Sequence, residues 1–147
     1  MTTVSQSECR RAGRLPALPR EGNIQLNATS VSVWEEHVDE PAMKQVFRGL
    51  MARLLRRGWR VERDPDVIRR WPSLADTRWV GEKRGLKMFA ETSGRMLKVE
   101  FYDESNVDNP NGARYDFNKY QRLSRFNRLR CVVEMAAVVR RLQSHGY

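Results

Sequence analysis

The chain has little of the chemistry that defines metal-binding and disulfide-rich proteins. Its 147 residues include only two cysteines and two histidines. Cys9 and Cys131 form no C-x-x-C pair, and His37 and His145 lie far from both, so the spacing of a zinc site is missing. We therefore expect no metal, no cofactor and no structural disulfide, which fits a reducing cytoplasmic setting.

Long hydrophobic runs are also missing. The longest apolar-rich stretch, residues 131–139, contains Glu134 and is about half the length that a membrane span of roughly 18 residues needs. Residues 1–16 lack the apolar segment of a secretory signal. The sequence thus predicts a cytoplasmic protein with no membrane partner.

Acidic residues are outnumbered, 18 against 27 Lys and Arg, which gives a net charge of +9. The excess is uneven. Residues 41–70 carry nine basic and three acidic side chains, and residues 114–147 carry eight and two, so each segment has a net charge of +6. Residues 23–40 are net −4, and residues 71–113 are net −1.

Arginine dominates the basic residues, with 22 Arg against 5 Lys. Its planar guanidinium donates paired hydrogen bonds to phosphate or carboxylate. A GC-rich genome produces the same ratio, but it does not explain the excess of positive charge.

Composition divides the chain in two. Residues 1–22 are polar, rich in arginine and interrupted by Pro16, Pro19 and Gly22, which predicts a disordered basic tail. Residues 23–147 have the length and composition of a single α+β domain.

Two helices are expected in this domain. Apolar residues recur with helical spacing from Met43 to Leu55, with Pro41 in the first turn and Gly58 as the C-terminal cap. Asp116 is predicted to cap a long final helix that ends near Gln143. Its second half is apolar on nearly all sides, which is typical of a buried helix or an interface.

Strands are expected around these helices. Alternating apolar residues predict strands at 23–28, 31–33 and 59–62, with a turn or bulge at 29–30. Residues 66–71 fit one helical turn, and residues 73–84 are predicted to be irregular.

The clearest strands form a hairpin over residues 84–92 and 95–102, with Ser93-Gly94 as a two-residue turn. This register pairs Lys87 with Glu100 and leaves one apolar face for the core. We expect a small antiparallel sheet of three to five strands, covered on one face by two helices.

Two known architectures share part of this pattern. The order of helix, three strands and helix is that of a double-stranded-RNA-binding domain, but the lysine-rich start of that domain's last helix is missing. Restriction-endonuclease-like nucleases hold a metal with an E-x-K strand. Here Lys98-Val99-Glu100 has the reverse order, with Glu91 as a possible second carboxylate. A solvated, charge-paired sheet face explains these residues more simply.

Several turn motifs suggest an origin. They are Gly58-Trp59-Arg60-Val61, Asp64-Pro65, residues 90–95 (AETSGR) and residues 111–117 (NGARYDF). Together they resemble small proteins encoded by phages and other mobile elements. The resemblance covers about half the chain and implies a bacterial or phage setting without a function.

The charge pattern favours non-specific nucleic-acid binding through the two basic helices, because arginines neutralise phosphates with little regard to sequence. The predicted contacts are Arg48, Arg53, Arg56, Arg57, Lys119, Arg122, Arg125 and Arg128. Tyr115, Tyr120 and Phe126 lie near them and can stack on bases, although core packing is the commoner role. Solvated helix faces would show the same charges.

The alternative is a protein that modulates a host or phage factor, or that forms a homodimer, through its apolar final helix. The predicted interface residues are Val132, Met135, Val139 and Leu142. No nucleophile elbow, phosphate loop or dinucleotide fingerprint occurs, so no catalytic residue is assigned. A metal-dependent nuclease is the least favoured alternative.

Overall fold

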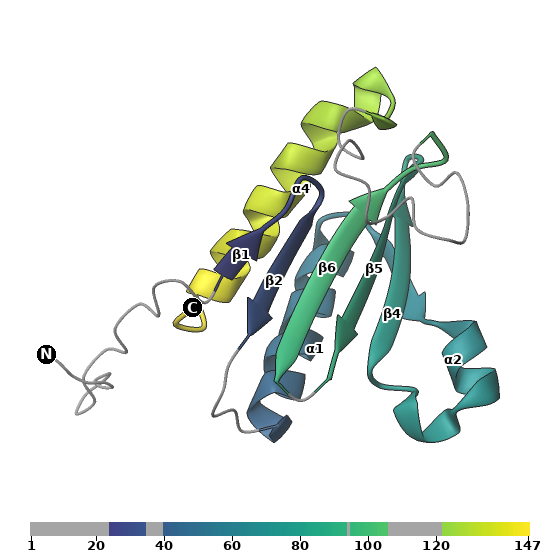
Figure 1. Ribbon diagram of the computed structural model, residues 1–147, viewed down its shortest axis with the longest axis vertical. Helices are drawn as coiled ribbons and strands as arrows, with labels where there is room; N and C mark the ends of the chain where they lie inside the picture. Colours follow the sequence, from purple (N-terminus) through teal and green to yellow (C-terminus); the bar gives the residue numbers. More distant parts are fainter. Residues whose placement is uncertain (1–23, 35–39, 94, 106–121) are drawn as a thin grey trace, which may run out of the picture.

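The computed structural model describes residues 24–34, 40–93, 95–105 and 122–147 (Figure 1). The elements in chain order are β1 (Ile24–Leu26), β2 (Ser30–Trp34), α1 (Glu40–Arg56), β3 (Arg60–Arg63), α2 (Pro65–Arg70), the 3-10 turn η1 (Pro72–Leu74), β4 (Arg78–Lys83), β5 (Leu86–Thr92), β6 (Met96–Tyr102) and α4 (Arg125–Gln143). The predicted α+β class is therefore confirmed.

The strands form one antiparallel sheet in the order β1-β2-β6-β5-β4-β3. β1 and β2 form a hairpin at one edge, and α1 carries the chain to β3 at the other edge. From there β3 to β6 run as a meander until β6 pairs with β2. The described sheet has six strands, so the expected three to five was too low.

The strand that sequence reasoning missed is β4, which lies within the segment predicted to be irregular. All six of its residues (RWVGEK) are half-buried, so burial does not alternate along the strand. Gly81 lies within the strand, where close packing requires a residue without a side chain. A Cβ atom there would lie 2.9 Å from both the carbonyl oxygen of Arg60 and Cε of Met88.

The predicted register of the β5–β6 hairpin is wrong by two residues. Glu91 lies opposite Lys98 and Phe89 opposite Glu100, so the expected pair of Lys87 and Glu100 does not form. The turn is longer than two residues, because the Ser93 N–H and the Thr92 hydroxyl both donate to the Met96 carbonyl. Each of these hydrogen bonds is 3.0 Å long. Since side chains alternate with a period of two, the apolar face still meets the core.

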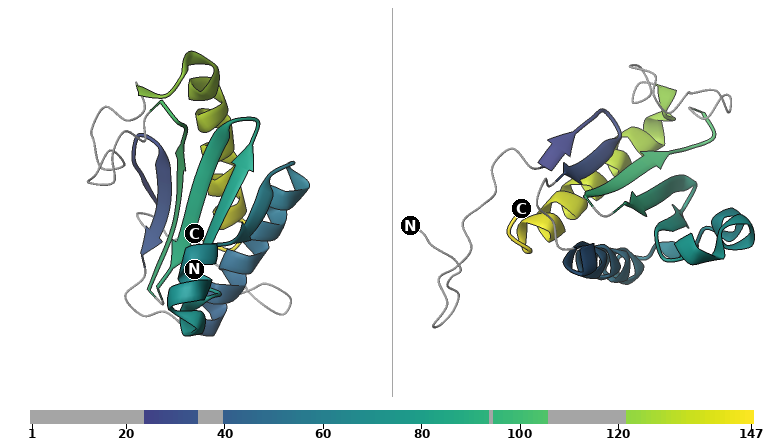
Figure 2. Two further views of the ribbon diagram at one scale, coloured as in Figure 1. Left: turned by 90° about the vertical axis from the view of Figure 1, so that its right-hand side faces the viewer. Right: turned by 60° about the horizontal axis from the view of Figure 1, so that its bottom comes forward.

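Helices α1 and α4 cover one face of the sheet, as Figure 2 shows. The predicted apolar stripe of α1 is confirmed by the burial of Met43, Phe47, Leu50 and Leu54, although Leu55 is exposed. Gly58 has the positive φ of 96° that a left-handed cap requires. The buried residues of α4 (Asn127, Cys131, Glu134, Ala137, Val138 and Leu142) recur at spacings of three, four or one.

The final helix begins later than predicted. Ser124 has non-helical backbone angles, with φ −59° and ψ 150°, and its side chain accepts a hydrogen bond from the N–H of Asn127, so α4 begins at Arg125. The predicted cap Asp116, with Lys119 and the two tyrosines, lies outside the described residues. So do the predicted tail at 1–22 and the acidic residues 35–39.

The opposite face of the sheet is not the solvated surface that the sequence suggested. Glu100 and Phe89 are both buried. The guanidinium of Arg78 lies 4.8 Å from the ring centroid of Phe89, and Nζ of Lys98 lies 3.4 Å from Oε1 of Glu100. On this face Arg78 therefore packs on Phe89, and Lys98 pairs with Glu100.

Candidate nucleic-acid interface

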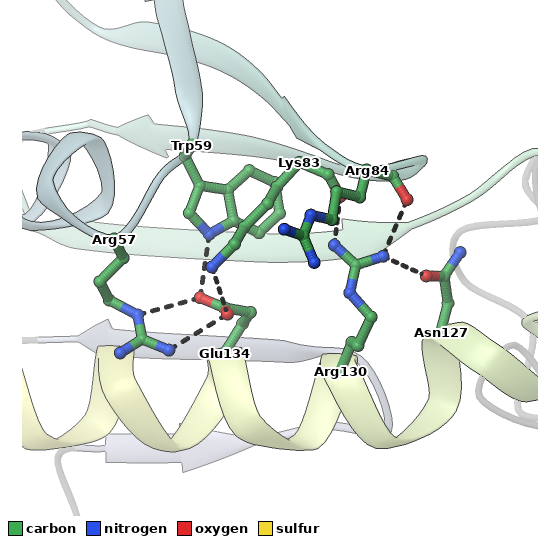
Figure 3. Close-up of polar contacts among 7 residues, drawn as sticks. All are labelled: Arg57, Trp59, Lys83, Arg84, Asn127, Arg130 and Glu134. Atoms are coloured by element: carbon green, nitrogen blue, oxygen red, sulfur yellow. Dashed lines mark hydrogen bonds and ion pairs between the residues drawn. The ribbon is translucent and has the colours of Figure 1, made fainter.

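A buried carboxylate joins three elements on the helical side of the sheet. Glu134 of α4 accepts hydrogen bonds from Nε and Nη2 of Arg57 (3.1 Å each), Nε1 of Trp59 (2.9 Å) and Nζ of Lys83 (3.2 Å) (Figure 3). Its side chain is only 6% exposed. We call these four residues the Glu134 cluster.

The surroundings of Glu134 keep it charged. Burial raises the pKa of its carboxyl, but the hydrogen bonds from Arg57, Trp59 and Lys83 together outweigh burial, and the pKa lies below its ordinary value. The cluster therefore holds two cations and one anion. Its net charge is therefore +1.

The sign of this pKa shift predicts acid sensitivity. A carboxyl whose pKa is depressed by folding stabilises the fold above its ordinary pKa of 4.5, and this contribution is lost as the pH falls from that value through the lower pKa of the folded state. We expect the free energy of unfolding, measured with urea, to fall between about pH 5 and pH 3. Asp103, whose pKa is also lowered, adds a loss of the same sign.

The Glu134→Gln variant separates the contribution of Glu134 to this pH dependence from that of Asp103. It should be less stable than the wild type at neutral pH, and its stability should decline less steeply with acid. An equally steep decline in the variant would show that Glu134 does not carry this dependence.

The turn between β4 and β5 is attached to the same helix. Nη1 of Arg130 donates to the carbonyl of Arg84 (2.9 Å) and to Oδ1 of Asn127 (2.6 Å), and Nη2 donates to the carbonyl of Lys83. Arg84 and Gly85 have positive φ angles of 51° and 85°, as a two-residue type I′ turn requires. Figure 3 shows the side chains of Lys83 and Arg84 both turned toward α4.

Two open recesses meet at this cluster. One of about 560 Å³ is lined by Arg57, Gly58, Arg60, Glu82, Lys83 and Arg84. The other, of about 430 Å³, is lined by Arg57, Lys83, Arg84, Phe126, Leu129, Arg130, Val133 and Glu134. Because they share Arg57, Lys83 and Arg84, we call them together the basic recess.

The rim of the basic recess carries an unusual aromatic residue. Phe126, in the first turn of α4, is 66% exposed, and the guanidinium carbon of Arg130 lies 5.1 Å from its ring centroid. The commoner role of such a residue, packing in the core, does not apply to Phe126. Leu129, one turn further along α4, is 70% exposed.

The predicted contact residues on α1 are only partly brought together. Arg53 and Arg57, which directly follows α1, are one helical turn apart, and Arg57 reaches Glu134 of α4. Arg48, nine residues before Arg57, points to the opposite side of the helix. Arg48, Arg53 and Arg56 are exposed, whereas Arg57 is half-buried and bound to Glu134.

The predicted nucleic-acid contacts near α4 also differ from one another in exposure and hydrogen bonding. Arg125 is exposed beside Phe126. Arg128 donates from Nε to the carbonyl of Leu123 (3.3 Å) at the helix start, and Arg122 is half-buried. Lys119 lies outside the described residues.

Sequence reasoning missed four residues of this site: Lys83, Arg84, Arg130 and Glu134. A single carboxylate within an apolar helical stretch was the available signal, because a buried charge requires cationic partners. Those partners could not be named, since Lys83 and Arg84 lie at the end of the unrecognised strand β4.

The four predicted residues of the protein interface differ in how far they are buried. Val132 is exposed, Met135 and Val139 are half-buried, and Leu142 lies fully within the core, where no partner can reach it. An apolar recess of about 470 Å³ is lined by Leu26, Ala28, Val132, Met135, Ala136, Val139 and Arg140. It lies between β1 and α4, and it shares no lining residue with the basic recess.

Comparison with known proteins gives no match to a family model, a characterised protein or a solved structure. None of the described helices is long and apolar enough to cross a membrane. Within residues 24–34, 40–93, 95–105 and 122–147, no three side chains of the metal-ligating types His, Cys, Asp and Glu come together.

Proposed function

We propose that this protein binds nucleic acid with little sequence specificity, through the basic recess and the arginines beside it. The observation that supports this most strongly is the composition of the recess. Arg57, Lys83, Arg84 and Arg130 line one part of it together with the buried carboxylate of Glu134. Phosphate is the natural ligand for several converging cations, of which most are guanidinium groups.

The two helices extend this positive surface. Helix α1 has four basic residues and one acidic residue, and α4 has five and one. Exposed Arg53 and Arg56 continue the recess along α1, and Arg125 continues it at the start of α4. The exposed phosphate contacts that we propose are Arg53, Arg56, Arg84 and Arg125, and the half-buried Arg57 lies beside them.

A mobility-shift experiment tests this proposal. At about 50 mM salt the protein should retard a labelled oligonucleotide, and at about 200 mM the shift should largely disappear, because binding releases counterions from the phosphates. The absence of any shift at the lower salt concentration would contradict the proposal.

A second candidate function is docking on a host or phage protein, or on a second copy of this chain. It is favoured by the exposure of Leu129, Val132 and Val133 on α4 and by the apolar recess that Leu26 also lines. Apolar contacts are insensitive to salt, so a partner that stays bound at high salt would support this candidate.

The proposed setting is the cytoplasm of a bacterial cell that carries a phage or mobile element. It rests on the resemblance of the turn motifs and on the two isolated cysteines. We propose no catalytic activity.

A further inference from the structure

We propose that the basic recess takes single-stranded nucleic acid, with an unpaired base stacked on Phe126. This inference rests on the proposed function and names its substrate class. Phe126 is 66% exposed, although it lies in the first turn of α4, which the side chain of Ser124 caps. An exposed aromatic ring beside cations is the usual platform for a nucleobase.

The platform is held in place before any ligand arrives. The guanidinium of Arg130 lies 5.1 Å from the Phe126 ring centroid, and its own position is fixed by the carbonyls of Lys83 and Arg84 and by Asn127. The side-chain amide of Asn127 donates in turn a hydrogen bond of 2.8 Å to the carboxylate of Asp103. A base that stacks here loses little free energy in ordering protein side chains.

The recess separates an apolar floor from a cationic wall. Phe126, Leu129 and Val133 come from successive turns of α4, and Lys83 and Arg84 come from the facing β4–β5 turn. A single strand can present bases to the floor and phosphates to the wall at the same time. In a duplex the base faces are stacked inside the helix and cannot reach Phe126, so only the phosphates would bind.

An amphipathic acidic peptide would satisfy the same floor and wall. The Phe126 ring and the Arg130 guanidinium form a flat pair, which favours a nucleobase as ligand. Stacking needs a planar partner, and every nucleobase is planar. The peptide therefore enters the test as the competing outcome.

The test compares Phe126→Ala with Phe126→Trp in anisotropy titrations of labelled oligothymidine, of about 16 nucleotides, and of a duplex of the same length. The Ala variant should bind the single strand about 5- to 150-fold more weakly, the Trp variant should bind it at least as well as wild type, and duplex affinity should not change. Trp71→Ala is the matched control, because Trp71 is also an exposed aromatic residue but lies outside the recess.

Each other outcome overturns the inference in a distinguishable way. If Phe126→Ala binds the single strand as tightly as wild type, the base platform is wrong but phosphate binding stands. An equal loss on single strand and duplex would show that Phe126 acts on the structure of the recess. If wild type binds neither oligonucleotide but binds an acidic amphipathic peptide, both this inference and the proposed function are wrong. Because Phe126 is exposed, thermal unfolding of the variants should match that of wild type.

Discussion

Replacing Glu134 with leucine is expected to lower the free energy of unfolding by about 3–5 kcal/mol, the usual cost of breaking a buried ion pair by removing one partner. The variant leaves the largely buried Arg57 and Lys83 without their carboxylate, and the buried Trp59 N–H without its acceptor. For a chain of this length the melting temperature should fall by on the order of 10 °C. Thermal and urea unfolding followed by circular dichroism measure both values.

Glu82→Gln is the matched control for this experiment. Glu82 also pairs with one arginine, Arg60, but both side chains are well exposed, so the loss should stay below about 1 kcal/mol. In addition, Arg57→Met combined with Glu134→Leu should recover part of the loss, because fewer buried charges are left unpaired. Equal effects of Glu134→Leu and Glu82→Gln would contradict the central role of the Glu134 cluster.

Reversing three exposed charges around the basic recess is expected to abolish nucleic-acid binding. In Arg53→Glu, Arg84→Glu and Arg125→Glu combined, three proposed phosphate contacts are lost and three repulsive charges take their place. The affinity for an oligonucleotide at low salt should fall by at least about 100-fold. These side chains are exposed and lie outside the Glu134 cluster, so the fold should persist.

The matched control reverses the same number of charges elsewhere. Arg48, Arg70 and Arg95 are exposed, and none of them lines the recess. Their combined change to Glu should weaken binding only modestly, through the change in net charge. If the two triple variants lose affinity equally, the binding is spread over the whole surface and the recess is not the site.

Local patterns predicted the elements whose sequence shows a clear period. The spacing of Met43, Phe47, Leu50 and Leu54 gave α1 and its buried face, and Gly58 gave its end. The register of β5 and β6 was not predictable in the same way, because a shift by two residues keeps every side chain on its face. The hydrogen bonds that the turn makes to the Met96 carbonyl close the hairpin in the observed register.

The candidate site could be predicted only in part, because it is assembled from distant segments. The helix arginines were visible as charge, but Arg57 and Glu134 are 77 residues apart, and Lys83 and Glu134 are 51 apart. β4, which ends at Lys83, has neither alternation nor a continuous apolar run. The exposure of Phe126 depends on the helix start at Arg125, and a helix predicted to begin near Asp116 did not reveal it.

The most direct test of nucleic-acid binding is the dependence of affinity on salt for the wild-type protein and a labelled single strand. Four exposed phosphate contacts predict that the logarithm of the association constant falls with the logarithm of salt concentration with a slope of about −3. A slope near zero, or no measurable binding at the lowest salt concentration, would contradict the account.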